Sequence, residues 1–269
     1  MIGAIIQARM TSTRLPGKVL KHVSGRPLLE YMLERLRCVN HLETIIIATT
    51  QNASDEPIVS FAQKHGVPFF RGSENDVLSR YHNTAESFGV KHIVRVTSDC
   101  PLIDPVIVDN AIALYLETGC DYLHLGTTFA EGLDTEVFSF DKLAWAHKHA
   151  RLKAEREHVT LFFHHNPDKV HKEIIECETD DSRYRITVDE PQDLEVVTAI
   201  FETLYSKEKP LFHIEEIKAF LDEHPLIFNK NANVVRNEGL LKSLNQEAEA
   251  AEAAAGTYAE KIIGNGERR

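Results

Sequence analysis

The residue types best suited to chemistry are concentrated in one short segment near the N-terminus, QARMTSTRLPGK, which spans residues 7–18. This segment contains Arg9, Arg14 and Lys18, three hydroxyl side chains and a Pro-Gly turn, and residues 1–29 include no acidic residue. A planar guanidinium matches phosphate oxygens, and an ammonium group supplies a mobile point charge. Because the segment directly follows a buried apolar run, we interpret it as a phosphate-binding loop, with a solvated basic loop as the alternative.

Two familiar phosphate loops do not match this segment. A dinucleotide fingerprint requires GxGxxG after the first strand, and that pattern of glycines is absent. A P-loop requires GxxxxGK[ST], but Ser12 stands where the first glycine belongs and Val19 follows the lysine. We therefore expect anion binding by side chains as well as by backbone.

Two aspartates follow apolar runs further along the chain. Asp99 lies in TSDCPLID (97–104), and Asp189 lies in TVDEPQDL (187–194). Magnesium prefers a few carboxylates combined with phosphate oxygens and water. We interpret the pair as ligands of Mg²⁺, although an aspartate in such a turn also serves as a helix cap. Asp104 and Asp193 are better explained as a helix cap and a first-turn acid.

The elements that must position these residues alternate between short apolar runs and amphipathic segments. The pattern predicts strands over 3–7, 44–49, 67–70, 92–97, 120–125, 136–140, 171–177 and 184–188. It predicts helices over 27–37, 55–65, 76–88, 141–150 and 154–165, and helices beginning near 104 and 191. Such alternation is typical of an α/β fold with a mostly parallel sheet covered by helices on both faces. Ligands in these sheets bind beyond the carboxyl ends of the strands.

Composition narrows the function classes further. The chain has 269 residues and a formal net charge of −11, which argues against a broad nucleic-acid-binding surface. No apolar run is long enough for a membrane span or a signal peptide, so we expect a cytoplasmic protein without a membrane partner. The four cysteines are widely spaced, which predicts free thiols and excludes a cysteine zinc site.

The string IIQARMTSTRLPGKVL resembles the N-terminal signature of the cytidylyltransferases that activate acidic sugars. The SpsF-type proteins of spore coat polysaccharide biosynthesis are the most similar branch, beside the acylneuraminate and 3-deoxy-manno-octulosonate cytidylyltransferases. The resemblance extends over residues 1 to about 240. It implies a GT-A-like (Rossmann-like) nucleotidyltransferase fold, a homodimer, CTP and Mg²⁺ as ligands, and transfer of CMP to a hydroxyl of a small acidic sugar with release of pyrophosphate.

The resemblance also implies roles for individual residues. Arg9, Lys18 and Asp99 would be catalytic, and Asp99 and Asp189 would bind the metal. Nucleotide binding would fall to Ala8, Arg9, Ser12, Arg14, Lys18, Arg71, Gly72, Ser73 and Ser98. Acceptor binding would fall to Asp134, Glu136 and Arg156, although Arg156 is equally compatible with an ion pair on a helix surface.

Three other functions are compatible with parts of the pattern. One is a sugar-1-phosphate nucleotidyltransferase using GTP, UTP or dTTP, whose first loop usually contains more glycine. Another is a GT-A glycosyltransferase, which tends to use a DxD pair that Cys100 and Pro101 interrupt here. The third is a nucleotide-binding protein without turnover. Beyond the domain of residues 1–240, an Ala/Glu-rich helical tail is expected over 241–269.

Overall fold

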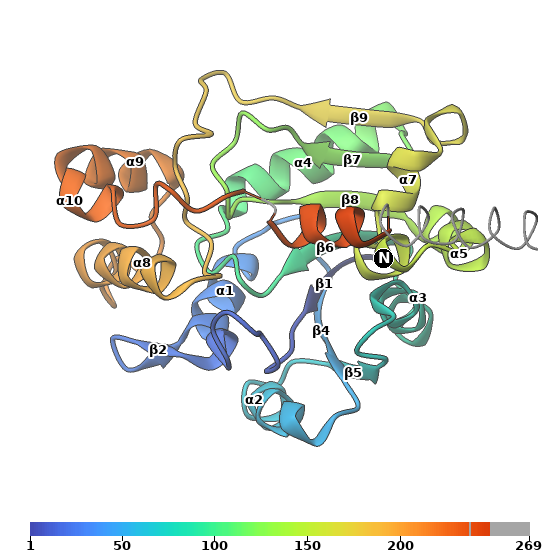
Figure 1. The fold of residues 1–269 in the computed structure, drawn as a ribbon, viewed down its shortest axis with the longest axis horizontal. Helices are drawn as coiled ribbons and strands as arrows, with labels where there is room; N and C mark the ends of the chain where they lie inside the picture. Colours follow the sequence, from blue (N-terminus) through green and yellow to red (C-terminus); the bar gives the residue numbers. More distant parts are fainter. Residues whose placement is uncertain (237, 248–269) are drawn as a thin grey trace, which may run out of the picture.

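The computed structural model describes residues 1–236 and 238–247, and a seven-stranded sheet forms its centre (Figure 1). The strand order is β5-β4-β1-β6-β8-β7-β9, and every neighbouring pair is parallel except the two that involve β8. The strands are β1 Ile2–Gln7, β4 Thr44–Thr50, β5 Phe69–Gly72, β6 His92–Thr97, β7 Tyr122–Leu125, β8 Glu136–Ser139 and β9 Lys172–Ile175; β2 His22–Val23 and β3 Arg26–Pro27 form a separate hairpin. The predicted α/β fold with a mostly parallel sheet is confirmed.

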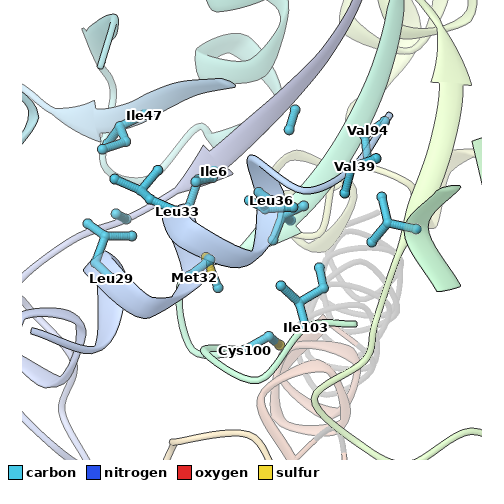
Figure 2. Close-up of a cluster of buried hydrophobic side chains, with 14 of the residues drawn as sticks. Ile6, Leu29, Met32, Leu33, Leu36, Val39, Ile47, Val94, Cys100 and Ile103 are labelled. Atoms are coloured by element: carbon cyan, nitrogen blue, oxygen red, sulfur yellow. The ribbon is translucent and has the colours of Figure 1, made fainter. Parts of the chain in front are cut away.

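Helices cover both faces of the sheet because successive strand residues point to opposite sides. Ala4 and Ile6 of β1 face one core, which α1, α2 and α4 complete, whereas Ile5 faces a second core completed by α3, α5 and α7. Figure 2 shows the apolar side of α1 lying against the strands in the first core. These helices are α1 Leu28–Leu36, α2 Glu56–Lys64, α3 Val77–Phe88, α4 Pro105–Thr118, α5 Phe140–His149, α6 Lys153–Glu157 and α7 Leu161–His165.

A third core lies beside the sheet and contains α8 Pro191–Leu204, α9 Ile214–Glu223 and α10 Pro225–Phe228. The predicted strand over 184–188 is wrong, because only an isolated bridge joins Arg185 to Glu131. The segment is extended and buried, but its backbone bonds to loops: Ile186 N donates to Glu131 O, and Val188 N donates to Asp99 O. A run of five buried residues therefore resembles a strand in the sequence, although within the described residues it pairs with loops and not with a neighbouring strand.

The predicted helix over 154–165 is also wrong as a continuous element. It is divided into α6 and α7 at Val159, whose φ of 49° lies in the left-handed region that a β-branched residue rarely adopts. The other predicted helices are present within two residues of the expected bounds, whereas β5 begins two residues later than expected. Asp104 caps α4 as predicted, by accepting from Val106 N, and Asp76 caps α3 in the same way, by accepting from Ser79 N.

The chain returns to the centre of the molecule after α10. Residues 238–247 form a further helix, drawn in red in front of the sheet in Figure 1. The predicted boundary at residue 240 falls inside this helix, and most of the predicted tail, 248–269, lies outside the described residues. Among the described residues, no helix has the length and apolar character needed to cross a membrane.

Candidate active site

A cavity of about 640 Å³ opens where β1 and β6 end. Its wall combines the loop after β1, the turn after β6 and the start of α3 with residues of β7, β8, α6, α7 and the helix over 238–247. The predicted site residues that line it are Ala8, Arg9, Ser12, Arg14, Lys18, Ser98, Asp99, Asp134, Glu136 and Asp189. The structure therefore brings most of the predicted site residues together in one cavity.

The loop after β1 is fixed by its backbone. Ala8 N donates to Ala48 O at 3.1 Å, and Gly17 N donates to Met10 O at 3.0 Å, which closes the loop. Gly17 has a φ of 68°, a left-handed conformation that glycine adopts without strain. The buried Asp55, expected to cap the helix over 55–65, makes no side-chain cap; instead it accepts a bond from Met10 N at 2.7 Å. The loop is therefore held from inside the protein, unlike a solvated basic loop.

Lys18 is the point at which the two predicted metal ligands meet. Its Nζ donates to Asp99 Oδ2 at 3.0 Å and to Asp189 Oδ1 at 2.6 Å. Burial lowers the pKa of Lys18, but the two carboxylates outweigh burial and the pKa is raised. Burial likewise raises the pKa of Asp99, but Lys18 and Thr97 lower it to about 2. Lys18 and Asp99 are therefore both charged at neutral pH.

The two carboxylates converge because Asp99 binds the segment that carries Asp189. The Asp99 carbonyl accepts from Val188 N at 2.8 Å and from Thr187 Oγ1 at 3.1 Å. Among the described residues, no group of three or more His, Cys, Asp or Glu could hold a metal ion. Two carboxylates focused on one positive charge beside the loop cations nevertheless fit Mg²⁺, which takes its other ligands from phosphate and water.

A buried network supports Asp189 from behind. Arg185 bonds Asp193 through two nitrogens, both at 2.8 Å, and pairs with Glu131. Asp193 also accepts from Asp189 N at 2.9 Å, and Asn231 Nδ2 donates to Asp193 at the same distance. Asp193 is thus a first-turn acid as predicted, and it also fixes the backbone of the predicted metal ligand.

The remaining loop cations lie at the cavity wall. Arg14 contacts three carboxylates, those of Asp189 at 3.0 Å, Glu190 at 3.3 Å and Glu238 at 3.1 Å. Burial lowers the pKa of Arg14, but these carboxylates raise it overall. Arg9 is half exposed and pairs with Glu74 at 3.6 Å. The loop therefore presents one buried ammonium and two more accessible guanidinium groups.

Four of the predicted site residues do not line the cavity: Arg71, Gly72, Ser73 and Arg156. The Arg71 guanidinium donates to the carbonyls of Thr50 and Asn52 and pairs with Glu56. Arg156 pairs at 2.7 Å with Asp76, the residue that caps α3. Both arginines hold elements together in this structure.

Sequence reasoning missed several residues of the cavity wall. Arg95, Tyr122, His124 and His164 line it, but each lies in a strand or helix where the pattern indicated core. Glu238 and Lys242 reach the cavity from the helix over 238–247. No local signal in the sequence connects these positions with the loop after β1.

A family model described as cytidylyltransferase matches residues 3–238. The chain belongs to the cytidylyltransferase family. It is a nucleotidyltransferase enzyme, which confirms the predicted family and enzyme class. The spore coat polysaccharide biosynthesis protein SpsF of Bacillus subtilis is 31% identical over 82% of this chain and 94% of its own length. An uncharacterised protein of Methanocaldococcus jannaschii is 37% identical over 86% of this chain and 94% of its own.

More distant relatives match a part of the cytidylyltransferase chain or its fold. The 3-deoxy-manno-octulosonate cytidylyltransferase of Geobacter sulfurreducens is 32% identical over 42% of this chain and 44% of its own. Among solved structures, a cytidylyltransferase from Leptospira borgpetersenii has a TM-score of 0.80 and 36% identity, covering 84% of this chain and 96% of that one. A CMP:2-keto-3-deoxy-manno-octonic acid synthetase, with a TM-score of 0.57 and 16% identity, shares the fold.

Proposed function

We propose that this cytidylyltransferase transfers CMP from CTP to a hydroxyl of an acidic sugar of the nonulosonic or octulosonic type, with release of pyrophosphate, for surface polysaccharide biosynthesis. The observation that carries the proposal is the meeting of Lys18 with Asp99 and Asp189 at one end of a cavity that continues toward Asp134 and Glu136. The names of SpsF and of the octulosonate cytidylyltransferases support the acidic sugar and the polysaccharide as its destination.

The chain's own residues would bind and align the reactants. Ala8, Arg9, Ser12, Arg14, Lys18 and Ser98 would hold the triphosphate of CTP along the loop wall. The oxygen of the acceptor hydroxyl would attack the α-phosphorus in line, so that a bond between this oxygen and the α-phosphorus forms while the bond from the α-phosphorus to the pyrophosphate oxygen breaks. The hydroxyl proton would be released to solvent. Negative charge grows on the leaving oxygens, and Arg9 and Lys18 would stabilise it because the loop after β1 holds these cations at the cavity wall before the reaction.

Asp99 and Asp189 would hold Mg²⁺. When bound, the ion neutralises phosphate charge and orients the triphosphate. In this structure the Lys18 ammonium lies between the two carboxylates, where the ion would bind. We therefore expect the ammonium to turn to a phosphate oxygen when the ion binds. Asp189 keeps its position meanwhile, because Asp193 holds its backbone nitrogen.

Asp134 is the predicted acceptor residue that is best placed for direct contact. It lines the cavity, and its carboxylate accepts from Gly132 N at 3.0 Å, with Arg236 at 3.7 Å. We expect Asp134 to bind a hydroxyl of the sugar near the reacting carbon.

Calorimetric titration tests the nucleotide. CTP, GTP, ATP, UTP and dTTP are titrated into the protein with and without Mg²⁺, and CTP alone should bind tightly in a Mg²⁺-dependent way. Pyrophosphate release is then measured with CTP and acidic sugars. A preference for GTP or UTP would contradict the proposal, and sedimentation would test the homodimer that the resemblance implies.

A further inference from the structure

A row of polar residues crosses the sheet floor of the cavity. Arg95 of β6, Glu136 of β8 and His124 of β7 are register partners, so their side chains lie on the same face of the sheet. All three line the cavity. The neighbouring partners Ile93 and Phe138, two residues along the same face, are fully buried apolar residues. The row thus interrupts an otherwise apolar surface.

Glu136 is occupied within the protein. Its Oε1 accepts from the Tyr122 hydroxyl at 2.5 Å and from Thr160 Oγ1 at 2.6 Å, and its Oε2 pairs with Arg95. Burial raises the pKa of Glu136, but Arg95 and the two hydroxyls lower it below its ordinary value. Because both oxygens already accept bonds from protein donors, Glu136 is better suited to positioning Arg95 than to binding a ligand.

Arg95 retains unused hydrogen-bonding capacity. Besides its pair with Glu136, its Nη2 makes one long bond, 3.3 Å to Gln7 Oε1, and its Nε has no partner among residues 1–236 and 238–247. His124 Nε2, on the far side of Glu136 in the same row, is likewise without a partner in the part of the chain that the structure describes. A buried ion pair seldom stabilises a protein more than apolar residues of similar size would. Buried donors without partners add a cost that a ligand oxygen would remove.

The position of Arg95 relative to Asp99 limits which part of a bound ligand Arg95 can contact. The two are four residues apart on one chain, about 13 Å if the segment is fully extended. The triphosphate cations lie at the Asp99 end, where the attacking hydroxyl must also be. The ion pair with Glu136 leaves the Arg95 end with little net charge, which suits neutral oxygens of hydroxyl or amide groups better than a phosphate.

We propose that Arg95, held in place by Glu136, is a specificity residue for the acceptor, donating to a hydroxyl or acylamino oxygen at the end of the sugar remote from the hydroxyl that attacks CTP. This inference rests on the proposed function, because it assigns one wall of the same cavity. It gives Glu136 a positioning role, and it narrows the acceptor to sugar acids with a polar group at their far end.

The test compares acceptors that differ only at that end. The probes are N-acetylneuraminic acid with its tail-shortened derivative, and 3-deoxy-manno-octulosonic acid with its 8-amino-3,8-dideoxy derivative. Wild-type protein, Arg95→Met, Arg95→Lys and Glu136→Gln are assayed for pyrophosphate release with CTP and Mg²⁺. Arg183→Met is the control, because Arg183 pairs with Asp222 outside the cavity. CTP binding is measured by calorimetry for every variant.

The wild type should prefer one member of a probe pair by about tenfold to a hundredfold in kcat/KM, the value of a hydrogen bond to a charged donor. Arg95→Met should remove that preference through the KM of the acceptor, with CTP affinity unchanged. Arg95→Lys, which keeps the charge but not the planar fork, should fold like the wild type and lose most of the preference. Glu136→Gln should weaken the preference by raising the KM of the favoured acceptor, because Arg95 is then held less firmly.

Three results would overturn the inference. The first is that the acceptor preference persists in Arg95→Lys. The second is that the CTP affinity of Arg95→Met falls together with its acceptor affinity. The third is that the wild type binds CTP with Mg²⁺ but turns over none of the four probes. Failure of the proposed function is distinct, because the wild type would then show no Mg²⁺-dependent CTP binding at all.

Discussion

Arg14 of the loop after β1 donates to the carboxylate of Glu238 at 3.1 Å, across 224 positions of sequence. Glu238 is the last residue matched by the family model, and it begins the helix over 238–247 that lines the cavity. The same helix is fastened to α6 through Glu247, whose carboxylate accepts from Ala154 N at 2.6 Å. The Glu238 carboxylate of this helix is therefore paired with Arg14, a cation that we propose binds the triphosphate.

This contact predicts competition between Glu238 and CTP. Glu238→Gln removes a negative charge from Arg14 and from the path of the triphosphate, so we expect the Kd for CTP, measured calorimetrically with Mg²⁺, to fall by a few-fold. Glu247→Gln is the control, since it alters the same helix without contacting Arg14. An unchanged or higher Kd in Glu238→Gln would show that Glu238 does not oppose the nucleotide.

The second prediction concerns the centre of the site. Lys18→Ala removes a cation that would stabilise the leaving pyrophosphate, and Asp99→Asn removes a ligand of the magnesium ion. Losing one preorganised charge of this kind costs about 2.7–4 kcal/mol of transition-state stabilisation, so each variant should lose at least about a hundredfold in kcat. Pyrophosphate release under saturating CTP provides the measurement, and circular dichroism verifies folding. Near-normal turnover in either folded variant would remove the residue from the mechanism.

Lys18 and Asp99 could be predicted because their loops follow β1 and β6, and the carboxyl ends of parallel strands meet at one edge of a sheet. Asp189 follows an extended segment outside the sheet, and it reaches the same place because that segment bonds to the Asp99 carbonyl. Arg95 could not be found in that way. Arg95 lies inside a strand whose pattern indicates core. Its proposed role depends on its pairing with Glu136 of another strand, and the sequence of one strand does not reveal that register. Glu238 depends on a contact across almost the whole chain. Arg71 and Arg156 follow the family pattern, but ion pairs in this chain hold them away from the cavity.

The turn that carries Asp134 requires glycine at position 132. Gly132 has a φ of 110°, and a Cβ there would lie 2.6 Å from Thr187 N and 2.7 Å from the carbonyl carbon of Ile186. Neither backbone atom can move without disturbing the segment that leads to Asp189. Gly132→Ala should therefore lower the free energy of unfolding by about 1–3 kcal/mol, measured in urea.

Gly126→Ala provides the matched comparison for Gly132→Ala. Gly126 does not have a left-handed φ, and its added Cβ would meet the Glu176 side chain, which can rotate away. We expect a smaller loss of stability than at position 132. Equal losses at the two positions would mean that backbone strain and crowding at Gly132 are not what selects glycine there.

A substitution of Arg156 distinguishes a structural role from the acceptor-binding role that the family pattern implied. Its guanidinium bonds Asp76 and Ser79 of α3 and the carbonyls of His147 and Ala150, so it joins three helices outside the cavity. Arg156→Met should lower the free energy of unfolding while the KM of the acceptor stays unchanged. A raised acceptor KM without loss of stability would restore the acceptor role.

The ion pair between Arg156 and Asp76 makes the free energy of unfolding depend on pH in a defined direction. Burial raises the pKa of Asp76, but Arg156 and Ser79 lower it below its ordinary value of 3.8. A carboxyl whose pKa is lower in the folded state contributes stability that is complete above its unfolded pKa and is lost as the pH falls through the folded pKa. Urea unfolding of the wild type and Asp76→Asn should therefore differ most near neutral pH and converge in acid below 3.8. A constant difference across that range would show that the ionised Asp76 carboxylate is not what Arg156 stabilises.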